Sequence, residues 1–163
     1  MNLGFDVQLQ VALRALSDVV APALSDAEKH VVEQLQLAMA TISFVKARLP
    51  EARRYYRMEL RHYLGLAGDA AEIASGDAQL KRIAEDGEAV LANPEADISD
   101  YEAITSRLRD EVTALASRAD LDIRVKLDRL VLDKSGELFP QYRQWASPFG
   151  FELKPGSLPA PAW

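Results

Sequence analysis

The strongest constraint on this chain is a pair of apolar heptad repeats that meet at Pro50. On both sides of this proline, between residues 25 and 75, apolar side chains recur at alternating spacings of three and four residues. Such spacing gathers them on one face of an α-helix, and a face of this kind needs a partner helix. We therefore predict two long helices. The repeats are Val31, Leu35, Ala38, Ile42, Val45 and Leu49, then Tyr56, Leu60, Tyr63, Ala67, Ala70 and Ala74.

The proline sets the joint between these two helices. Proline disfavours helical dihedrals in the residue before it, here Leu49, and suits the first turn of a following helix. We therefore expect a tight joint and an antiparallel helix pair. Ser25 and Glu28 have the spacing of a capping box, which predicts the start of the first helix.

Other segments also carry helical periodicity. Residues 5–24 are apolar on nearly every side, so we expect this helix to be central or covered on two sides. Ser99 and Glu102 match a second capping box at the start of a later helix. The segments predicted to be helical, besides the central pair, are 5–24, 78–92, 100–118 and 120–134.

Residues 121–128 are ambiguous because apolar and polar side chains alternate there, as in a strand. We nevertheless predict a helix. No second segment offers a strand partner, and a lone strand would leave its backbone groups unpaired.

The composition changes at Phe139. Five of the eight prolines and both tryptophans lie in the last 25 residues. Proline disfavours a long helix, and the aromatic side chains argue against a free polar linker. We predict a helical domain over residues 1–138 and an extended arm over 139–163, docked on the helices or on a partner subunit. The predicted fold is all-α, an antiparallel up-and-down bundle of four to six helices with a proline- and aromatic-rich C-terminal arm.

Composition excludes several classes of protein. The chain has no cysteine, which rules out disulfides, thiolate catalysis and cysteine zinc sites and fits a cytoplasmic location. Residues 1–20 lack the basic start of a secretory signal, and no apolar run approaches the roughly 18 residues of a membrane span. A net charge of −6 argues against nucleic-acid binding. We expect neither nucleic acid nor a membrane as a partner.

A local cluster of arginines contrasts with this acidic balance. We call Arg53, Arg54, Arg57 and Arg61 the arginine ridge, and Tyr56 lies within it. Arginine binds phosphates and carboxylates bidentately, so the ridge is a candidate site for an anion or an acidic partner. The alternative is a solvated helix face that pairs with residues 69–102, a segment rich in acidic side chains.

Catalytic motifs give no comparable signal. Glu59 and His62 have the Glu-x-x-His spacing of di-metal bundles, but such a site needs a second pair, and the only other histidine is His30. No nucleophile elbow or phosphate-binding glycine loop occurs. We therefore predict no catalytic residue, no metal site and no cofactor.

These observations predict a non-enzymatic interaction or accessory protein that works as a homodimer or beside another protein. Leu37 and Phe44 lie outside the heptad positions and suggest a second interface. The alternative is a small-ligand module, or an enzyme, that binds an anionic phosphate or carboxylate compound at the arginine ridge. The residues predicted to form an interface are Leu37, Phe44, Phe139, Tyr142, Trp145 and Phe149.

Overall fold

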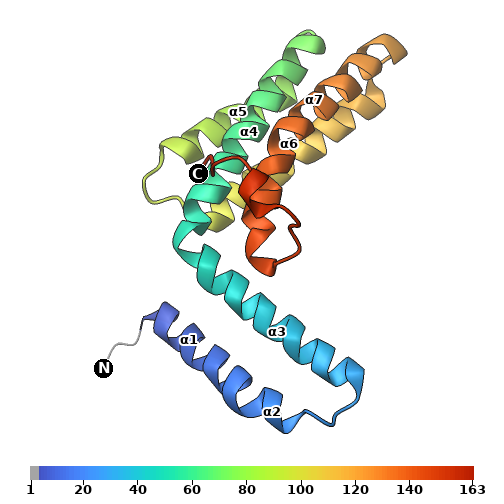
Figure 1. Ribbon diagram of the computed structural model, residues 1–163. Helices are drawn as coiled ribbons and strands as arrows, with labels where there is room; N and C mark the ends of the chain where they lie inside the picture. Colours follow the sequence, from blue (N-terminus) through green and yellow to red (C-terminus); the bar gives the residue numbers. More distant parts are fainter. Residues whose placement is uncertain (1–3) are drawn as a thin grey trace. The chain divides into compact units, whose positions relative to one another are not determined.

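The computed structural model describes residues 4–163, and every regular element in this range is helical (Figure 1). The predicted all-α class is therefore confirmed. None of the described helices combines the length and the apolar character needed to cross a bilayer. The main helices are α1 (Phe5–Ala15), α2 (Ala21–Ala23), α3 (Lys29–Arg48), α4 (Ala52–Ile73), α5 (Ala78–Ala92), α6 (Ile98–Arg118) and α7 (Leu121–Ala146). A π-helical turn (Leu16–Val20) and 3₁₀ turns (Leu49–Glu51, Ser147–Phe149, Pro155–Ser157) complete the set.

The chain forms two compact units. Unit 1 consists of residues 4–50 with Tyr142–Pro159, and unit 2 consists of Glu51–Gln141 with Ala160–Trp163. The predicted domain boundary between residues 138 and 139 lies inside α7.

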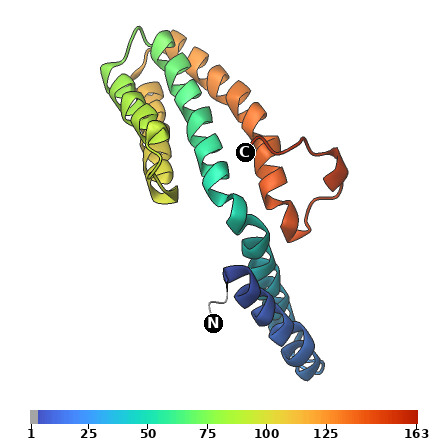
Figure 2. The same cartoon turned by 90° about the vertical axis from the view of Figure 1, so that its left-hand side faces the viewer.

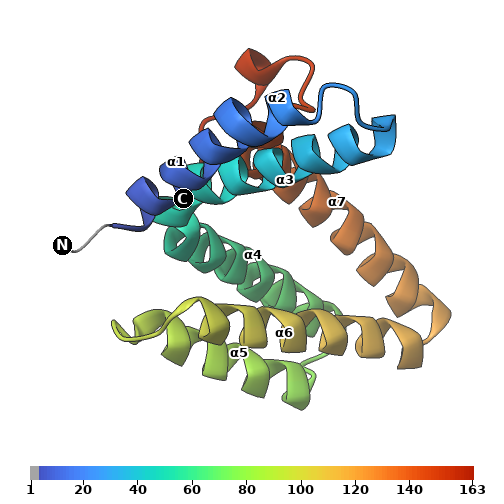
Figure 3. The same ribbon diagram turned by 90° about the horizontal axis from the view of Figure 1, so that it is seen from below.

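Unit 2 contains the hydrophobic core. Helices α5 and α6 lie side by side, and both pack on α4 (Figure 3). Small side chains on α4 let these helices approach closely, and larger ones from all three fill the centre. The fully buried large side chains of the core are Leu60, Leu80, Tyr101, Leu108 and Leu127.

Helix α7 runs back along α4 within unit 2 (Figure 2). Leu127 and Leu138 are buried, and Lys134 Nζ lies 3.2 Å from Asp69 Oδ2 on α4. Residues 121–128 lie in this helix, so the helical prediction for that segment is confirmed.

Unit 1 is built on a helical hairpin in which α1 packs beside α3 (Figure 1). The end of α7 and the 3₁₀ turn after it also pack on α3. Phe44 of α3 stacks on Phe149 with ring centroids 4.4 Å apart, and Trp145 meets Phe44 edge-on at 6.0 Å.

The break between α3 and α4 falls at Pro50 as predicted, but the dihedral angles expected at Leu49 and two predicted helix caps are wrong. Leu49 keeps helical dihedrals (φ −50°, ψ −43°) because Pro50 sits in a 3₁₀ turn, and the steric effect of proline is a preference rather than a barrier. Ser25 does not cap α3, which begins at Lys29 with no side-chain cap. The second capping box lies two residues earlier than predicted, between Asp97 and Asp100.

The predicted antiparallel pairing of residues 25–49 with 50–75 is not a feature of either unit, because α3 and α4 belong to different units.

Two other predictions need correction. The helix over residues 5–24 forms, with a π-helical turn in its second half, but it is not central, since none of its residues is buried. The chain does not become extended at Phe139, because α7 includes Pro140 and continues to Ala146. The carbonyl group that Pro140 deprives of a hydrogen bond belongs to Gly136, whose missing side chain leaves room for a local adjustment.

The packing of α5 predicts opposite effects for two glycine substitutions. A Cβ atom on Gly87 would lie 2.8 Å from Leu64 Cδ2 and 3.1 Å from Ile104 Cγ2, whereas one on Gly65 meets nothing within 4 Å. We expect Gly87→Ala to lower the free energy of unfolding by about 1–3 kcal/mol through overpacking. Gly65→Ala should raise it by about 0.5–1 kcal/mol through helix propensity. Urea unfolding measures both changes. An equal increase in the free energy of unfolding of the two variants would contradict the close packing at Gly87.

Candidate functional site

The arginine ridge lies on α4, and two of its members are hydrogen-bonded to backbone. Arg53 Nε donates to the carbonyl of Ala96 at 3.1 Å, and its Nη2 donates to that of Pro94. Arg57 Nη2 donates to the carbonyl of Leu91 at 2.9 Å. These acceptors lie in the last turn of α5 and in the loop that follows. Carbonyl groups at a helix C-terminus lack intrahelical partners and carry partial negative charge, so Arg57 stabilises the end of α5, and Arg53 stabilises the loop that follows.

The other two arginines of the ridge face solvent. Arg54 and Arg61 are exposed, and neither has a hydrogen bond or ion pair with the described residues 4–163. The structure therefore divides the predicted site into a structural pair and a solvated pair. The first pair does meet the acidic segment, mainly through hydrogen bonds to backbone carbonyls, and the charge of Arg53 also lowers the pKa of the Asp97 carboxyl after that group's own hydrogen bonds.

Tyr56 is half-buried beside a carboxylate. Burial raises the pKa of its phenol, and the charge and hydrogen bond of Glu102 raise it further. An anion placed against Tyr56 would meet the negative charge of Glu102. This geometry gives the predicted anion site little support.

Arg48 binds the end of a second helix in the same way, within unit 1. Its Nε donates to the carbonyl of Trp145 at 2.8 Å, and its Nη2 donates to that of Gln144 at 2.6 Å. Nη2 also contacts Ser147 Oγ at 3.1 Å. Sequence reasoning did not identify this contact, because backbone acceptors about 100 residues away have no signature in the sequence.

The predicted interface residues divide into two groups. Phe44, Trp145 and Phe149 contact one another within unit 1, and Tyr142 is half-buried. Leu37 and Phe139 are exposed, and they belong to different units. The first group therefore stabilises unit 1, and the second leaves large apolar surface open.

The last residues of the chain contact unit 2. The side-chain amide of Gln141 accepts a hydrogen bond from the N–H of Ala162 at 2.9 Å and donates to the carbonyl of Ala160 at 3.4 Å. The Trp163 indole donates to the carboxylate of Glu51, and its ring meets Tyr55 edge-on. The end of the tail is therefore held by specific polar contacts.

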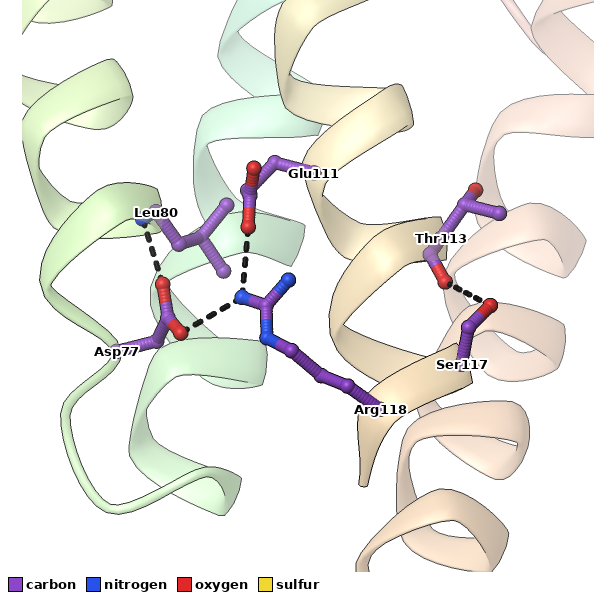
Figure 4. Close-up of polar contacts among 6 residues, drawn as sticks. All are labelled: Asp77, Leu80, Glu111, Thr113, Ser117 and Arg118. Atoms are coloured by element: carbon purple, nitrogen blue, oxygen red, sulfur yellow. Dashed lines mark hydrogen bonds and ion pairs between the residues drawn. The ribbon is translucent and has the colours of Figure 1, made fainter.

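A groove of about 460 Å³ lies between α6 and α7. The Thr113 hydroxyl donates to the Arg109 carbonyl at 2.9 Å. The Ser117 hydroxyl donates to the Thr113 carbonyl at 2.8 Å (Figure 4), so both hydroxyls are satisfied within α6. The groove therefore combines an apolar floor with few free polar groups. Its lining residues are Val112, Thr113, Ala116, Ser117, Arg124, Asp128, Val131 and Leu132.

A row of exposed apolar side chains on α7 continues from this groove. Leu121, Val125, Leu132 and Phe139 are each 58–74% exposed. Val125, Leu132 and Phe139 are seven residues apart, and Leu121 lies four before Val125, so the row follows one side of the helix. We call these four residues the α7 row. Of them, the sequence analysis singled out only Phe139.

Arg118, at the end of α6, forms an ion pair that links this helix to the start of α5. Its Nη2 lies 2.8 Å from Asp77 Oδ2 and 2.7 Å from Glu111 Oε1 (Figure 4). Asp77 also caps α5 by accepting a hydrogen bond from the Leu80 N–H at 2.8 Å. This bond, followed by the contact with Arg118, lowers the pKa of the Asp77 carboxyl.

His62 and Glu59 do not form a metal centre with other described residues. Among residues 4–163, no group of three or more histidine, aspartate or glutamate side chains is placed to hold an ion. His62 is half-buried against Tyr63, and burial lowers its pKa, with Glu137 and Lys134 acting in opposite directions.

The contacts of the arginine ridge predict two classes of variant. Arg57→Ala removes a charged donor to a helix-end carbonyl, so it should lower the free energy of unfolding by about 1–3 kcal/mol. Arg53→Ala should act in the same direction. Arg54→Ala and Arg61→Ala are matched controls on the same helix, and they should change stability by less than about 0.5 kcal/mol. Urea unfolding distinguishes the classes, and equal losses in all four would contradict the helix-capping role.

Asp77 predicts a pH-dependent contribution to stability. Asp77→Ala removes the helix cap and should cost about 1 kcal/mol at pH 7. Asp77→Asn keeps a capping oxygen, so its smaller loss reports the charge contact with Arg118. Because the folded-state pKa lies below the ordinary 3.8, that charge contribution is present above pH 3.8 and is lost as the pH falls through the folded-state value. Urea unfolding of wild type and Asp77→Asn should therefore converge in acid, and a difference that grows there would contradict the assignment.

Comparisons with known proteins provide no identity for this site. Neither a protein-family model, nor a curated protein, nor a solved structure matches the chain. The functional argument therefore depends on the residues and geometry described above.

Proposed function

We propose that this is a non-enzymatic interaction protein that binds an amphipathic helix of a partner protein on unit 2. The proposed site is the α6–α7 groove together with the α7 row. The observation that carries the proposal is the exposure of four large apolar side chains at helical spacing beside an apolar groove. Exposed apolar surface of this kind is typical of sites that bind proteins.

The length of the surface fits a helix. Leu121 and Phe139 are 18 residues apart, which corresponds to about 27 Å of α-helix. A partner helix of about five turns would cover this distance and place apolar residues at every third or fourth position against the row. Arg124 and Asp128 line the groove and could pair with polar residues at the edge of that helix.

The charge of unit 2 selects a basic partner. Unit 2 holds 19 acidic and 13 basic side chains, so it carries the whole net charge of −6. A charge of this size attracts basic segments and speeds their association, and salt weakens the effect. We therefore propose that the partner helix has lysine or arginine beside its apolar face.

The C-terminal arm is part of the same proposal. We propose that α4, α5, α6 and α7 form an antiparallel up-and-down bundle in unit 2 and that the last residues of the chain dock on this unit. The contacts of Gln141 with Ala160 and Ala162, and of Trp163 with Glu51, support this docking. A docked arm leaves the α7 row available to another protein.

A model peptide tests the proposal. The probe is a fluorescein-labelled 18-residue peptide of leucine, lysine and alanine with leucine at heptad positions, titrated by fluorescence anisotropy. We expect saturable binding that weakens with salt, and at least a tenfold loss of affinity in Leu132→Glu, because a charge would face the apolar helix. Leu153→Glu is the matched control, since Leu153 is 95% exposed and belongs to unit 1.

Two results would overturn the proposal. A peptide of the same composition with its leucines moved off the heptad must bind more weakly than the probe. Equal binding of the two peptides would show that charge, and not an apolar helix face, determines the affinity. Equal affinity of Leu132→Glu and wild type for the probe would place binding elsewhere on the protein.

A further inference from the structure

The hairpin of α1 and α3 in unit 1 leaves apolar surface uncovered on its own. No residue of α1, α2 or α3 is buried within the described residues 4–50. Two helices cannot surround a core, so their apolar side chains stay in contact with water. The large apolar residues that are exposed in this segment are Phe5, Val7, Val11, Val19, Val31, Leu37, Val45 and Leu49.

One flank of the hairpin is polar. Lys46 Nζ donates to Gln10 Oε1 at 2.7 Å and lies 3.6 Å from Asp6 Oδ1. A shallow depression on this flank is lined by Asp6, Leu13, Ser43, Lys46 and Ala47. These contacts place the side of α1 that carries Asp6 and Gln10, and the side of α3 that carries Lys46, on the same flank of the hairpin.

The opposite flank is apolar. Apolar residues recur at heptad spacing on α1 as they do on α3. Because a helix turns about 100° per residue, both rows lie on the side of the hairpin away from the Lys46 contacts. We call these ten residues the heptad flank, and none of them is polar. They are Phe5, Leu9, Ala12 and Leu16 of α1 and the following turn, with Val31, Leu35, Ala38, Ile42, Val45 and Leu49 of α3 and the following turn.

We infer that the heptad flank is where a second copy of this chain docks, so that two hairpins complete a four-helix bundle. Heptad rows on both helices of a hairpin are the pattern that packs in such bundles. A two-fold symmetric interface uses the same patch on both copies, and a continuous apolar flank is complementary to itself. This surface is separate from the α6–α7 groove.

Charge favours a second copy as the occupant. Unit 1 holds six acidic and six basic side chains, so two such units do not repel each other. A bilayer would instead favour a basic polar flank, whereas the polar flank of this hairpin carries Asp6 beside Lys46, and unit 1 has no excess of basic side chains.

The dimensions of the flank are sufficient for a dimer. Val31 and Leu49 are 18 residues apart, or about 27 Å of helix, and two adjacent helices are about 20 Å wide. These dimensions project to about 540 Å². The accessible surface of the protruding side chains exceeds this projection, so the flank approaches the roughly 800 Å² that a standard interface buries on each partner. Ala12 and Ala38, near the middle of each row, allow the two hairpins to approach closely.

Light scattering on the full-length protein tests the inference. Across a dilution series, wild type should reach twice the chain mass of 18.0 kDa. Ala38→Glu with Val45→Glu should halve that mass, because four carboxylates would be buried in the interface. Ala47→Glu is the matched control, an exposed alanine of α3 on the polar flank, and it should remain dimeric. Circular dichroism verifies that each variant stays helical.

The chain has no cysteine, so a single label can report proximity between two copies. Pyrene attached to Ala38→Cys should give excimer emission that dilution removes, and pyrene on Ala47→Cys should not. A monomeric wild type overturns the inference, as does a dimer that survives the double substitution. Binding of monomeric wild type to vesicles of phosphatidylcholine and phosphatidylglycerol, lost only in the double variant, would assign the flank to lipid instead.

The two proposals can fail separately. The Ala38→Glu/Val45→Glu variant should bind the model peptide as wild type does, because the α6–α7 groove lies in unit 2. Leu132→Glu should remain a dimer. If either variant became monomeric and also lost peptide binding, the assignment of two independent surfaces would be contradicted.

Discussion

The end of helix α5 depends on guanidinium groups from α4. Arg57 donates to the Leu91 carbonyl in the last turn of α5, and Arg53 donates to the Pro94 and Ala96 carbonyls in the loop after it. This contact fixes the turn that leads into α6, where Asp97 and Asp100 cap the next helix and Ala96 is buried. The loop leads into α6, whose later turns, at residues 112–117, form one wall of the groove. Arg48 repeats the device at the end of α7.

Much of the helical layout could be predicted because periodicity and caps are local. The N-cap residue Asp77 and the helices over residues 78–92 and 100–118 depend only on neighbours in the sequence. The role of Arg57 could not be predicted, since its acceptor is a backbone carbonyl 34 residues away, and every residue has one. The sequence predicts a break at Pro140 because the cost of a proline depends on its immediate neighbours. The packing of the rest of α7, which offsets that cost, depends on distant residues and is not visible in the sequence.

The alternating pattern of residues 121–128 has a specific structural cause. Residues two apart on an α-helix point in nearly opposite directions, about 200° from each other. Ile123 and Leu127 face the core of unit 2, whereas Leu121 and Val125 face solvent. A helix with two apolar sides therefore produces the same alternation as a half-buried strand. The strand-like alternation of this segment therefore arises because α7 has a second apolar side. That side carries the α7 row, which we propose binds a partner helix.

The distribution of charge connects the two proposed surfaces. Both units expose apolar side chains, but unit 1 is neutral and unit 2 carries −6. Like charges oppose the meeting of two copies through unit 2, so its apolar row is protected from self-association while it remains attractive to basic segments. No such repulsion acts on unit 1, where the heptad flank is complementary to itself. Apolar area alone would let either surface pair with the other. Under the two proposals, the charge difference would direct a second copy to unit 1 and a foreign helix to unit 2.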